Sequence, residues 1–452
     1  MVFTLDEDIE ELCISDDDCE ETPQQLLQPM VAEHVSKHRR KSSVLEKFPV
    51  VAPLNSRRLS ISVGDGQRQG IDPKILADFK PVRVLGKGAY GKVVLVKDER
   101  TSKLYAMKQL QKAEIIIEND APHDVSKRVE RIFAERTILS QLEHPNVVKL
   151  FYTFHDNSRL YLLLQYIPGG ELFYHLKERG TLDEDTAAFY AAEISCALKF
   201  LHEKGIVYRD LKPENCLLDA NGHLVLTDFG LSKKSVDDSD SPSSPEDVSV
   251  LHSIIGTPEY CAPEILKGEP YTRNCDWYSL GCLVYDMLVG KPPYTGANHK
   301  VILNKIQKEK QGPRIPYYLS DGMKDWLGAL LKKDLKKRWD VDRYWAAQSQ
   351  SQQPQRDRRK KKKAGQERTS PYTSHFVFRK VNWAKIQDGM QQKSEQGPIV
   401  PIITNPELAE NFDEEFTSLP FEESQQARDI PKSDIFEGFS YKASGSYLEK
   451  YF

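Results

Sequence analysis

The hydrophobic pattern changes character partway along the chain. After Phe79, short β-like runs separated by turn residues are consistent with an antiparallel sheet: PVRVL, KVVLV and KLYAMKQL. Residues 125–142 then place apolar side chains at a helical period. Two further strand-like runs, VVKLFYTF and RLYLLLQYI, end at Pro168. Beyond that point the pattern predicts mainly helices, over 186–202, 277–289 and 322–333.

A β-rich segment followed by a helix-rich segment predicts an α+β fold of two lobes, joined near residues 165–170. We expect residues 1–78 to be disordered, because they are acidic at first and then basic and serine-rich. A Gln/Ser tract followed by a Lys/Arg tract forms an insertion at 348–368. The last segment, 379–452, is interpreted as loop-like with spaced aromatic residues.

Composition narrows the class of protein. The chain is 39% hydrophobic and 29% charged, as soluble globular proteins are, and its net charge of −4 gives no bulk attraction for nucleic acid or membranes, so we expect no DNA partner. Its 7 cysteines form no C-x-x-C pair, which argues against zinc or disulfides and for a reducing compartment. The N-terminus is acidic from Asp6, unlike a signal peptide, and no apolar run predicts a transmembrane segment. We expect a cytoplasmic protein, with the nucleus as the alternative.

A glycine-rich run is the first candidate for chemistry. Residues 86–93 read G-x-G-x-x-G-x-V, and glycines let backbone amides approach phosphate oxygens closely. Such a run alone is a weak signal. A dinucleotide-binding fold would need a helix directly after the glycines. A strand-like run follows instead, which favours a β-hairpin over the phosphates.

Lys108 lies in a predicted apolar strand. Burying a lysine is costly unless an anion meets it, so a phosphate partner is one interpretation, and a lysine at the sheet edge that reaches water is the other. Glu135, on the predicted helix, is placed to neutralise and orient Lys108. Taken alone, this glutamate is an ordinary solvated helix residue.

Polar residues gather later, in YRDLKPEN (208–215) and TDFG (227–230). Phosphoryl transfer needs a carboxylate that orients the hydroxyl and accepts its proton, and Asp210 is the candidate. It also needs oxygen ligands for Mg²⁺, a role that suits Asn215 and Asp228. Each motif alone is common, but their joint order is a strong signal for phosphoryl transfer.

Together these motifs resemble the eukaryotic protein kinases, over about Phe79 to Phe378. The resemblance implies a bilobal kinase fold that uses ATP and Mg²⁺, with Asp210 as catalytic base and Lys212 on the transferring phosphate. It makes Asn215 and Asp228 the metal ligands. The ATP-binding residues that it implies are Leu85, Gly86, Lys87, Gly88, Ala89, Tyr90, Gly91, Lys92, Val93, Ala106, Lys108, Glu135, Leu164, Gln165, Ile167, Glu171 and Leu217.

Several further residues match positions of the same family. Ala262-Pro263-Glu264 is similar to its A-P-E motif, and Asp276 to the aspartate of the following large helix. Lys212 together with Gly256-Thr257 implies serine/threonine rather than tyrosine specificity. Since no required group is missing, a catalytically silent ATP-binding scaffold is the weaker alternative.

Within the family, the chain resembles the AGC group, because Tyr208 replaces the usual histidine before Arg209-Asp210. The tail supports this with FDEEFT (412–417) and FEGFSY (436–441), whose paired aromatics imply docking in a hydrophobic pocket of the N-lobe. The resemblance thus implies that residues 379–452 are an AGC-kinase C-terminal domain that wraps the N-lobe. The sequence GFSY (438–441) is most similar to that of the ribosomal S-six kinases. Protein kinase B and the serum-regulated kinases are the next most similar groups. FTLDE (3–7) is similar to the motif by which S-six kinases bind the TOR complex but departs at Thr4 and Glu7, so a plain acidic tail is the alternative.

The resemblance also implies regulation by upstream kinases. Ser253, three residues before Gly256, matches the activation-segment phosphosite, and its phosphate is expected to pair with Arg209, Arg131 and Lys233. Ser440 matches the hydrophobic-motif site. For the turn-motif site Ser424 has the family's spacing, and Ser418 competes with it. We expect a monomer.

Substrate selectivity is implied by two carboxylates. Glu171 and Glu214 match positions that recognise an arginine three residues before the acceptor, which implies protein substrates with R-x-x-S/T or R-x-R-x-x-S/T sites. A ribose contact of Glu171 is compatible with this role. RRLS (57–60) of the chain itself resembles such a site.

Late in the second lobe the chain departs from the family. Arg338 is expected to pair with Glu264, but Trp339 stands where the family usually has leucine. The basic cluster 356–363 inside the insertion has three readings: a nuclear signal, a patch for RNA or acidic lipid, or a solvated loop.

Overall fold

The computed structural model describes residues 75–88, 90–116, 122–234, 251, 255–309, 312–345, 371–387, 389, 391–419 and 434–452. Several residues singled out in the sequence lie outside these ranges: Ala89, Ser253, Ser424, the segments 3–7 and 57–60, and the insertion 348–368 with its basic cluster.

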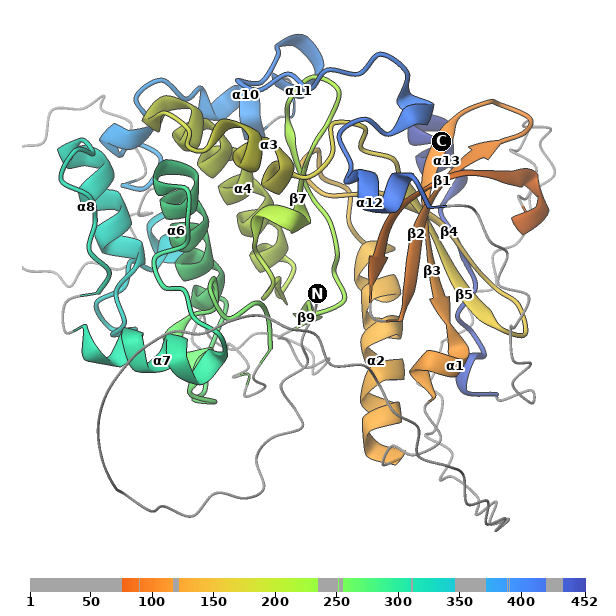
Figure 1. The fold of residues 1–452 in the computed structure, drawn as a ribbon, viewed down its shortest axis with the longest axis horizontal. Helices are drawn as coiled ribbons and strands as arrows, with labels where there is room; N and C mark the ends of the chain where they lie inside the picture. Colours follow the sequence, from red (N-terminus) through yellow and green to blue (C-terminus); the bar gives the residue numbers. More distant parts are fainter. Residues whose placement is uncertain are drawn as a thin grey trace, which may run out of the picture. The chain divides into compact units, whose positions relative to one another are not determined.

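The N-terminal lobe is built on a six-stranded antiparallel sheet (Figure 1). Its order is β1-β2-β3-β5-β4-β10, from β1 (Phe79–Gly88), β2 (Gly91–Asp98), β3 (Leu104–Gln111), β4 (Leu150–His155), β5 (Arg159–Gln165) and β10 (Tyr441–Lys442). β1 and β2 form the hairpin expected at the glycine-rich run. Gly91 is required there, because a Cβ at this position would lie 1.8 Å from the carbonyl oxygen of Gln109.

Strand alternation divides the side chains of this sheet between two faces. On β3, Tyr105 and Met107 belong to an apolar cluster on one face, whereas Ala106 and Lys108 line the cleft on the other. The short helix α1 (Lys112–Ile115) follows β3 in the chain, and the next helix, α2 (Pro122–Leu139), lines the cleft. The expected helix over 125–142 is therefore present, shifted by about one turn toward the N-terminus.

The C-terminal lobe is mainly helical, as the pattern predicted. Its core helices are α4 (Glu184–Glu203), α6 (Asn274–Val289) and α8 (Asp321–Leu330), which match the three expected helices. Asp183 caps α4 by accepting hydrogen bonds from two backbone amides of its first turn. The other helices of this lobe are α3 (Leu172–Arg179), α5 (Pro263–Leu266), α7 (His299–Lys308) and α9 (Val341–Trp345).

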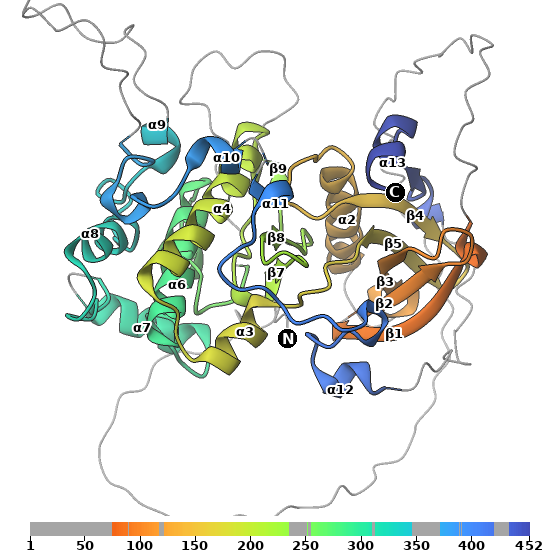
Figure 2. The same ribbon diagram turned by 90° about the horizontal axis from the view of Figure 1, so that it is seen from above.

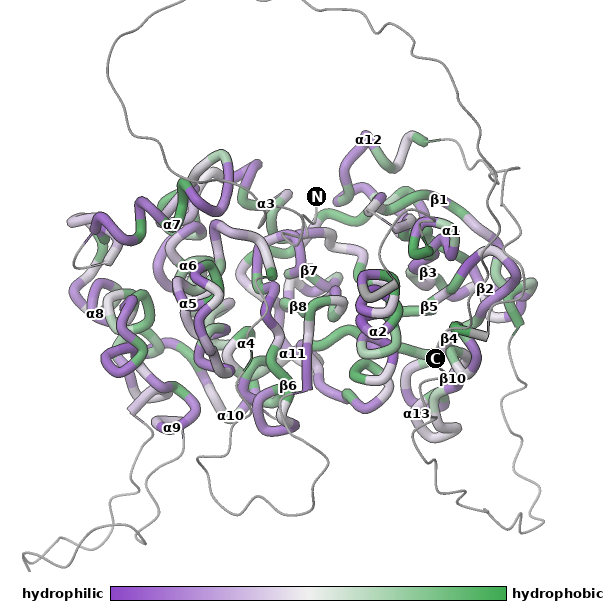
Figure 3. Tube along the Cα trace, turned by 90° about the horizontal axis from the view of Figure 1, so that it is seen from below, coloured by the Kyte–Doolittle hydropathy of each residue, from purple (hydrophilic) through white to green (hydrophobic). Residues whose placement is uncertain are grey.

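Two short strand pairs lie where the lobes meet. β7 (Cys216–Leu218) pairs with β8 (Leu224–Leu226), and β6 (Ile206–Val207) pairs with β9 (Lys233–Lys234). Figure 3 shows hydrophobic residues along β5 and β8 and mixed colours along α2. The polar segments 208–215 and 227–230, described below, follow the buried strands β6 and β8.

The tail runs back from the helical lobe to the sheet (Figure 2). It contains α10 (Trp383–Gln387), α11 (Gln391–Ser394), α12 (Glu414–Thr417) and α13 (Gly445–Tyr451). The 3-10 turns of the described chain are Leu76–Asp78, Pro213–Asn215, Phe376–Phe378, Pro406–Leu408 and Asp434–Phe436.

The expectation of a loop-like tail was wrong for its last part. There β10 adds to the edge of β4, and α13 packs Leu448 and Phe452 onto the apolar face of the sheet. A helix this short is marginal in isolation, so its stability comes from that packing rather than from a sequence pattern.

Trp339, the departure from the family, has a structural explanation. Its ring lies 5.3 Å from that of Tyr372 and 5.7 Å from that of His375. Tyr372 is fully buried and its hydroxyl lies 2.8 Å from Ser195 Oγ. The larger ring therefore helps to pack the segment after the insertion onto α4.

Across the described ranges, no helix is long and apolar enough to cross a membrane.

Candidate active site

A cleft of about 390 Å³ opens between the β1–β2 hairpin and the helical lobe. Its lining contains every residue expected to bind ATP except Ala89, which lies outside the described ranges. Asp210, Glu214 and Asp228 also line it. The volume is in the range of small-ligand sites.

Lys108 on β3 is held between two carboxylates. Its Nζ lies 2.7 Å from Glu135 Oε1 on α2 and 3.2 Å from Asp228 Oδ1. Burial alone would lower the pKa of Lys108, but Asp228 and Glu135 outweigh it and raise that pKa. Lys108 holds the pKa of Asp228 below its usual range, so both groups stay charged. The ion pairs exclude the reading of Lys108 as an edge lysine that reaches water.

The loop after β6 gathers the groups expected to perform the chemistry. The amide Nδ2 of Asn215 donates to Asp210 Oδ2 and to the Asp210 carbonyl, both at 2.8 Å. Lys212 Nζ lies 3.2 Å from Asp210 Oδ2 and donates to Thr257 Oγ1 at 3.0 Å. Thr257 in turn donates to Asp210 Oδ1 at 3.3 Å. Burial raises the pKa of Asp210, with Lys212 opposing the shift.

Asn215 and Asp228 fit the role of magnesium ligands. Because Asn215 directs its amide nitrogen to Asp210, its side-chain oxygen remains available as a ligand. Asp228 uses Oδ1 for Lys108 and for the Gly230 amide, at 3.2 Å each, and Oδ2 remains as a second oxygen donor. Oxygen donors of this kind are those that Mg²⁺ prefers.

The path of the catalytic loop depends on Asp276 of α6. Its Oδ1 accepts the Arg209 amide at 2.8 Å and its Oδ2 accepts the Tyr208 amide at 2.9 Å. Arg209 has a φ of 67°, a region that non-glycine residues rarely adopt, so these bonds hold a strained backbone.

A second expected contact is also present. The guanidinium of Arg338 donates to both carboxylate oxygens of Glu264, at 2.6 Å and 2.9 Å.

Leu251 is the described residue that lies just before the predicted phosphosite Ser253 in the chain. Leu251 exchanges two backbone hydrogen bonds with Tyr271, both of 2.9 Å. The Tyr271 hydroxyl accepts from Arg209 Nη1 at 3.0 Å, while Arg209 Nε donates to the Leu231 carbonyl at 2.7 Å. The guanidinium of Arg209 is therefore near the chain that leads to Ser253, which itself lies outside the described residues.

The hydrophobic motif of the tail is docked on the N-terminal lobe. Phe436 and Phe439 are buried, and the Phe439 ring meets that of Phe133 on α2 edge to face at 5.7 Å. Gly438 makes the turn between them with a φ of 80°. Arg136 donates to the Gly438 carbonyl at 2.9 Å and to the Ser440 carbonyl at 3.3 Å, and Ser440 is exposed.

The two carboxylates expected to recognise a substrate arginine, Glu171 and Glu214, are close enough to interact electrostatically. Burial, together with Glu214 and Asp413, raises the pKa of Glu171 to about 7. Both Glu171 and Glu214 line the cleft. Lys212 opposes this shift, but burial and the two neighbouring carboxylates outweigh it and disfavour the negative charge of Glu171.

Sequence reasoning missed one wall of the cleft. Phe412 of the tail lines it and stacks on Tyr166 at 6.0 Å. Phe412 belongs to a small apolar cluster with Leu85 and Leu95. The family resemblance implied that the tail wraps the N-lobe, but nothing in the sequence indicates that Phe412 lines the cleft.

Comparisons with known proteins agree with this geometry. The protein kinase domain family matches residues 79–349, more than half of the chain. The serine/threonine-protein kinase YPK3 of Saccharomyces cerevisiae is 62% identical over 459 residues, which cover 92% of this chain and 87% of the yeast protein. Sgk1 of Danio rerio is 35% identical over 414 residues, covering 88% and 83%. AtPK2/AtPK19 of Arabidopsis thaliana is 36% identical over 370 residues, covering 81% and 68%.

The chain belongs to the protein kinase family. More narrowly, it is a serine/threonine protein kinase of the AGC type, which confirms the predicted bilobal α+β fold and enzyme class. The place of the chain within that group remains a prediction.

Proposed function

We propose that this kinase transfers the γ-phosphoryl group of ATP, with Mg²⁺, to serine or threonine in arginine-flanked protein segments. The observation that carries the proposal is the assembled pair of ion contacts, Lys108 with Glu135 and Lys108 with Asp228, beside the Asp210 cluster. In kinases both the lysine–glutamate pair and the metal-binding aspartate must be in place for transfer.

Each residue of the cluster has a separate task in this proposal. Asp210 orients the substrate hydroxyl and accepts its proton, and Asn215 fixes the direction of that carboxylate. Lys212, within reach of Asp210 and Thr257, stabilises charge on the transferring group. Lys108 would meet the α/β-phosphates, while Asn215 and Asp228 would hold Mg²⁺, which would neutralise phosphate charge.

Arginine selectivity is proposed from Glu171 and Glu214. Two neighbouring carboxylates at the mouth of a cleft bind a guanidinium well, because it offers several donors in a fixed planar array. The pKa of Glu171 is raised to about 7, first by burial and then by the charges of Glu214 and Asp413, so its negative charge is disfavoured. A substrate arginine beside Glu171 would stabilise the charged form.

A role in TOR-linked growth signalling, with a ribosomal protein as substrate, is the finer proposal. Its support is the resemblance of residues 438–441 and of segment 3–7 to the S-six kinases. The similarity to proteins named Sgk1 favours a serum-regulated type of kinase in another pathway as the second candidate. In either case we propose a cytoplasmic or nuclear monomer that upstream kinases phosphorylate at Ser253, Ser440 and a turn-motif site, Ser424 or Ser418.

Radiolabel transfer from ATP to an arginine-rich peptide tests the chemistry. Asp210→Ala should abolish incorporation, whereas Asp325→Ala, at an aspartate whose side chain is 82% exposed, should leave it unchanged. Equal incorporation by wild type and Asp210→Ala would refute the catalytic assignment. A positional peptide library then tests selectivity: indifference to arginine three residues before the acceptor would exclude the role of Glu171 and Glu214.

The pathway needs a measurement in cells. Mass spectrometry of the kinase before and after TOR inhibition should show loss of phosphate at Ser440 and reduced phosphorylation of a ribosomal protein. Phosphate at Ser440 that persists under inhibition would contradict the TOR link and favour the second candidate.

A further inference from the structure

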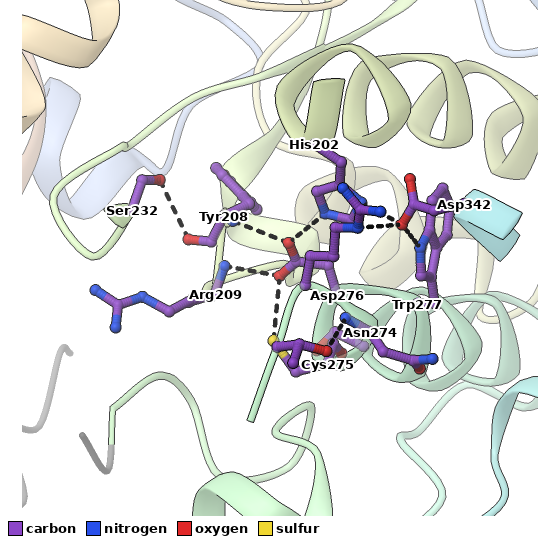
Figure 4. Close-up of polar contacts among 12 residues, drawn as sticks. His202, Tyr208, Arg209, Ser232, Asn274, Cys275, Asp276, Trp277 and Asp342 are labelled. Carbon is purple, nitrogen blue, oxygen red and sulfur yellow. Dashed lines mark hydrogen bonds and ion pairs between the residues drawn. The ribbon is translucent and has the colours of Figure 1, made fainter. Parts of the chain in front are cut away.

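A buried charge network connects the catalytic loop to α9. His202, in the last turn of α4, has a side chain that is 0% exposed. Its Nε2 lies 2.8 Å from Asp276 Oδ2 on α6, and its Nδ1 lies 2.9 Å from Asp342 Oδ2 on α9. Figure 4 shows the imidazole of His202 between these two carboxylates.

The outer carboxylate of this network is itself held in place. Asp342 Oδ2 accepts the indole N–H of Trp277 at 2.8 Å and lies 3.4 Å from Arg273 Nε. Its side chain is only 3% exposed. Asp342 is therefore positioned by α6 from one side while it contacts His202 from the other.

The geometry defines the protonation state of His202. A neutral imidazole has one N–H, so one of its nitrogens would face a carboxylate oxygen with a lone pair, whereas the imidazolium donates to both. Burial alone would lower the pKa of His202, but Asp342 and Asp276 outweigh it and raise the pKa to about 9. Arg273 is the cation that faces Asp342, at 3.4 Å, and it helps to keep that carboxylate charged.

We propose that Asp342 is a positioning residue for phosphoryl transfer. It orients the imidazolium of His202, which fixes the carboxylate of Asp276, and that carboxylate holds the two backbone amides that set the path of the loop into Asp210. Asp342 touches no reacting atom, and its role rests on the catalytic function proposed for Asp210. The strained φ of Arg209 makes the loop sensitive to the exact direction of Asp276.

Asp342→Asn tests this chain of contacts, because asparagine keeps an acceptor for Trp277 but removes the charge beside His202. In the activated full-length kinase we expect kcat to fall about tenfold at pH 8, with KM for ATP and peptide within about twofold. The loss should grow between about pH 6.5 and 8.5, since His202 then titrates near its ordinary pKa. In wild type the corresponding step should lie at higher pH, centred near pH 9, because the pKa of its His202 is about 9.

Two matched variants separate positioning from general destabilisation. Asp340→Asn makes the same change two residues away, at a side chain that accepts from the Arg343 amide in α9, and should leave kcat and its pH profile unchanged. In the Asp342→Asn background, a second change His202→Gln should remove the extra step in the pH profile. A variant with a lower melting temperature but a pH profile parallel to wild type would overturn the proposal in favour of a structural role.

A further test uses the native protein, so it does not depend on whether a variant folds. Nitrogen-15 labelling of histidine should show His202 protonated on both ring nitrogens at pH 7.5, and a neutral ring there would refute the proposal. Because this readout does not need activity, it stays valid if the proposed phosphotransfer fails. An inactive wild type with a doubly protonated His202 would contradict the proposed function alone.

Discussion

The catalytic loop and the end of the tail are both held against the body of the kinase, but by different contacts. Behind the loop, Asp276 and His202 provide buried, charged hydrogen bonds of 2.8–2.9 Å. At the tail, Phe439 packs on Phe133, and Phe452 stacks on Tyr105 with 4.7 Å between ring centroids. One region is held by directional charge, the other mostly by aromatic surface.

The difference matches what each region must do. Charge-assisted hydrogen bonds fix atoms in direction as well as distance, which a transfer reaction needs. Aromatic packing is less directional and is gained or lost as a segment docks or leaves. The exposed Ser440 lies inside the aromatically held segment, where a phosphate would change docking without entering the catalytic loop.

The largest effect should come from breaking the charged region at its centre. Lys108→Met removes the cation that neutralises Glu135 and Asp228, and we expect kcat to fall by about a thousandfold or more. Lys97→Met, on the neighbouring strand at a partly exposed ion pair with Glu407, is the control and should stay within about twofold. Steady-state kinetics with ATP and peptide measures both, and comparable losses would show that burial of the charge is not what matters.

The tail should respond less steeply. Phe439→Ala removes a fully buried ring, which weakens docking of the motif by about 3–5 kcal/mol, and Phe133 of α2, two residues before Glu135, loses a packing partner. We expect activity to fall about tenfold, with faster hydrogen exchange in α2.

The control for this variant is Phe376→Ala, at a ring that is 61% exposed. It should change neither activity nor exchange. Full activity of Phe439→Ala would mean that docking of the tail is not coupled to the ion pair of Lys108.

The two regions were also unequally predictable from sequence. Lys108, Asp210 and Asp228 were predicted because phosphoryl transfer demands particular side chains in a particular order, and all three line one cleft. The core strands and helices were found because their hydrophobic periods are long enough to read. Neither kind of signal depends on knowing the tertiary structure.

The remainder depends on contacts between distant segments. His202 and Asp342 are 140 residues apart, and no local pattern relates them. Phe412 enters the cleft and α13 covers the sheet only because the tail reverses across the N-terminal lobe. Short aromatic segments of this kind gain their structure from the surface that they meet.

A pH series tests the charge of Glu171, which burial and two neighbouring carboxylates disfavour. With a pKa of about 7, Glu171 is mostly ionised at pH 8 and mostly protonated at pH 6. Because only the carboxylate attracts a guanidinium, kcat/KM for a peptide with arginine three residues before the acceptor should fall about threefold to fivefold from pH 8 to 6. The same peptide with alanine there should change less.

The control for the pH series is Glu171→Gln, which cannot ionise. It should remove the difference between the arginine and alanine peptides across this range. A difference that persists with the same pH dependence would assign the titration to another group, such as Glu214.

The smallest effect on activity is expected at the far face of the sheet. Phe452 contacts Tyr105, Phe151 and Tyr152, all on the face opposite Lys108. Phe452→Ala should therefore lower the melting temperature by a few degrees, through about 2–3 kcal/mol of lost packing, while kcat stays within about twofold. Ile402→Ala, at a side chain that is 79% exposed, should change neither. If Phe452→Ala instead reduced kcat as strongly as Phe439→Ala, both faces of the sheet would be coupled to the catalytic ion pair, and the tail would act as one unit from Phe436 to Phe452.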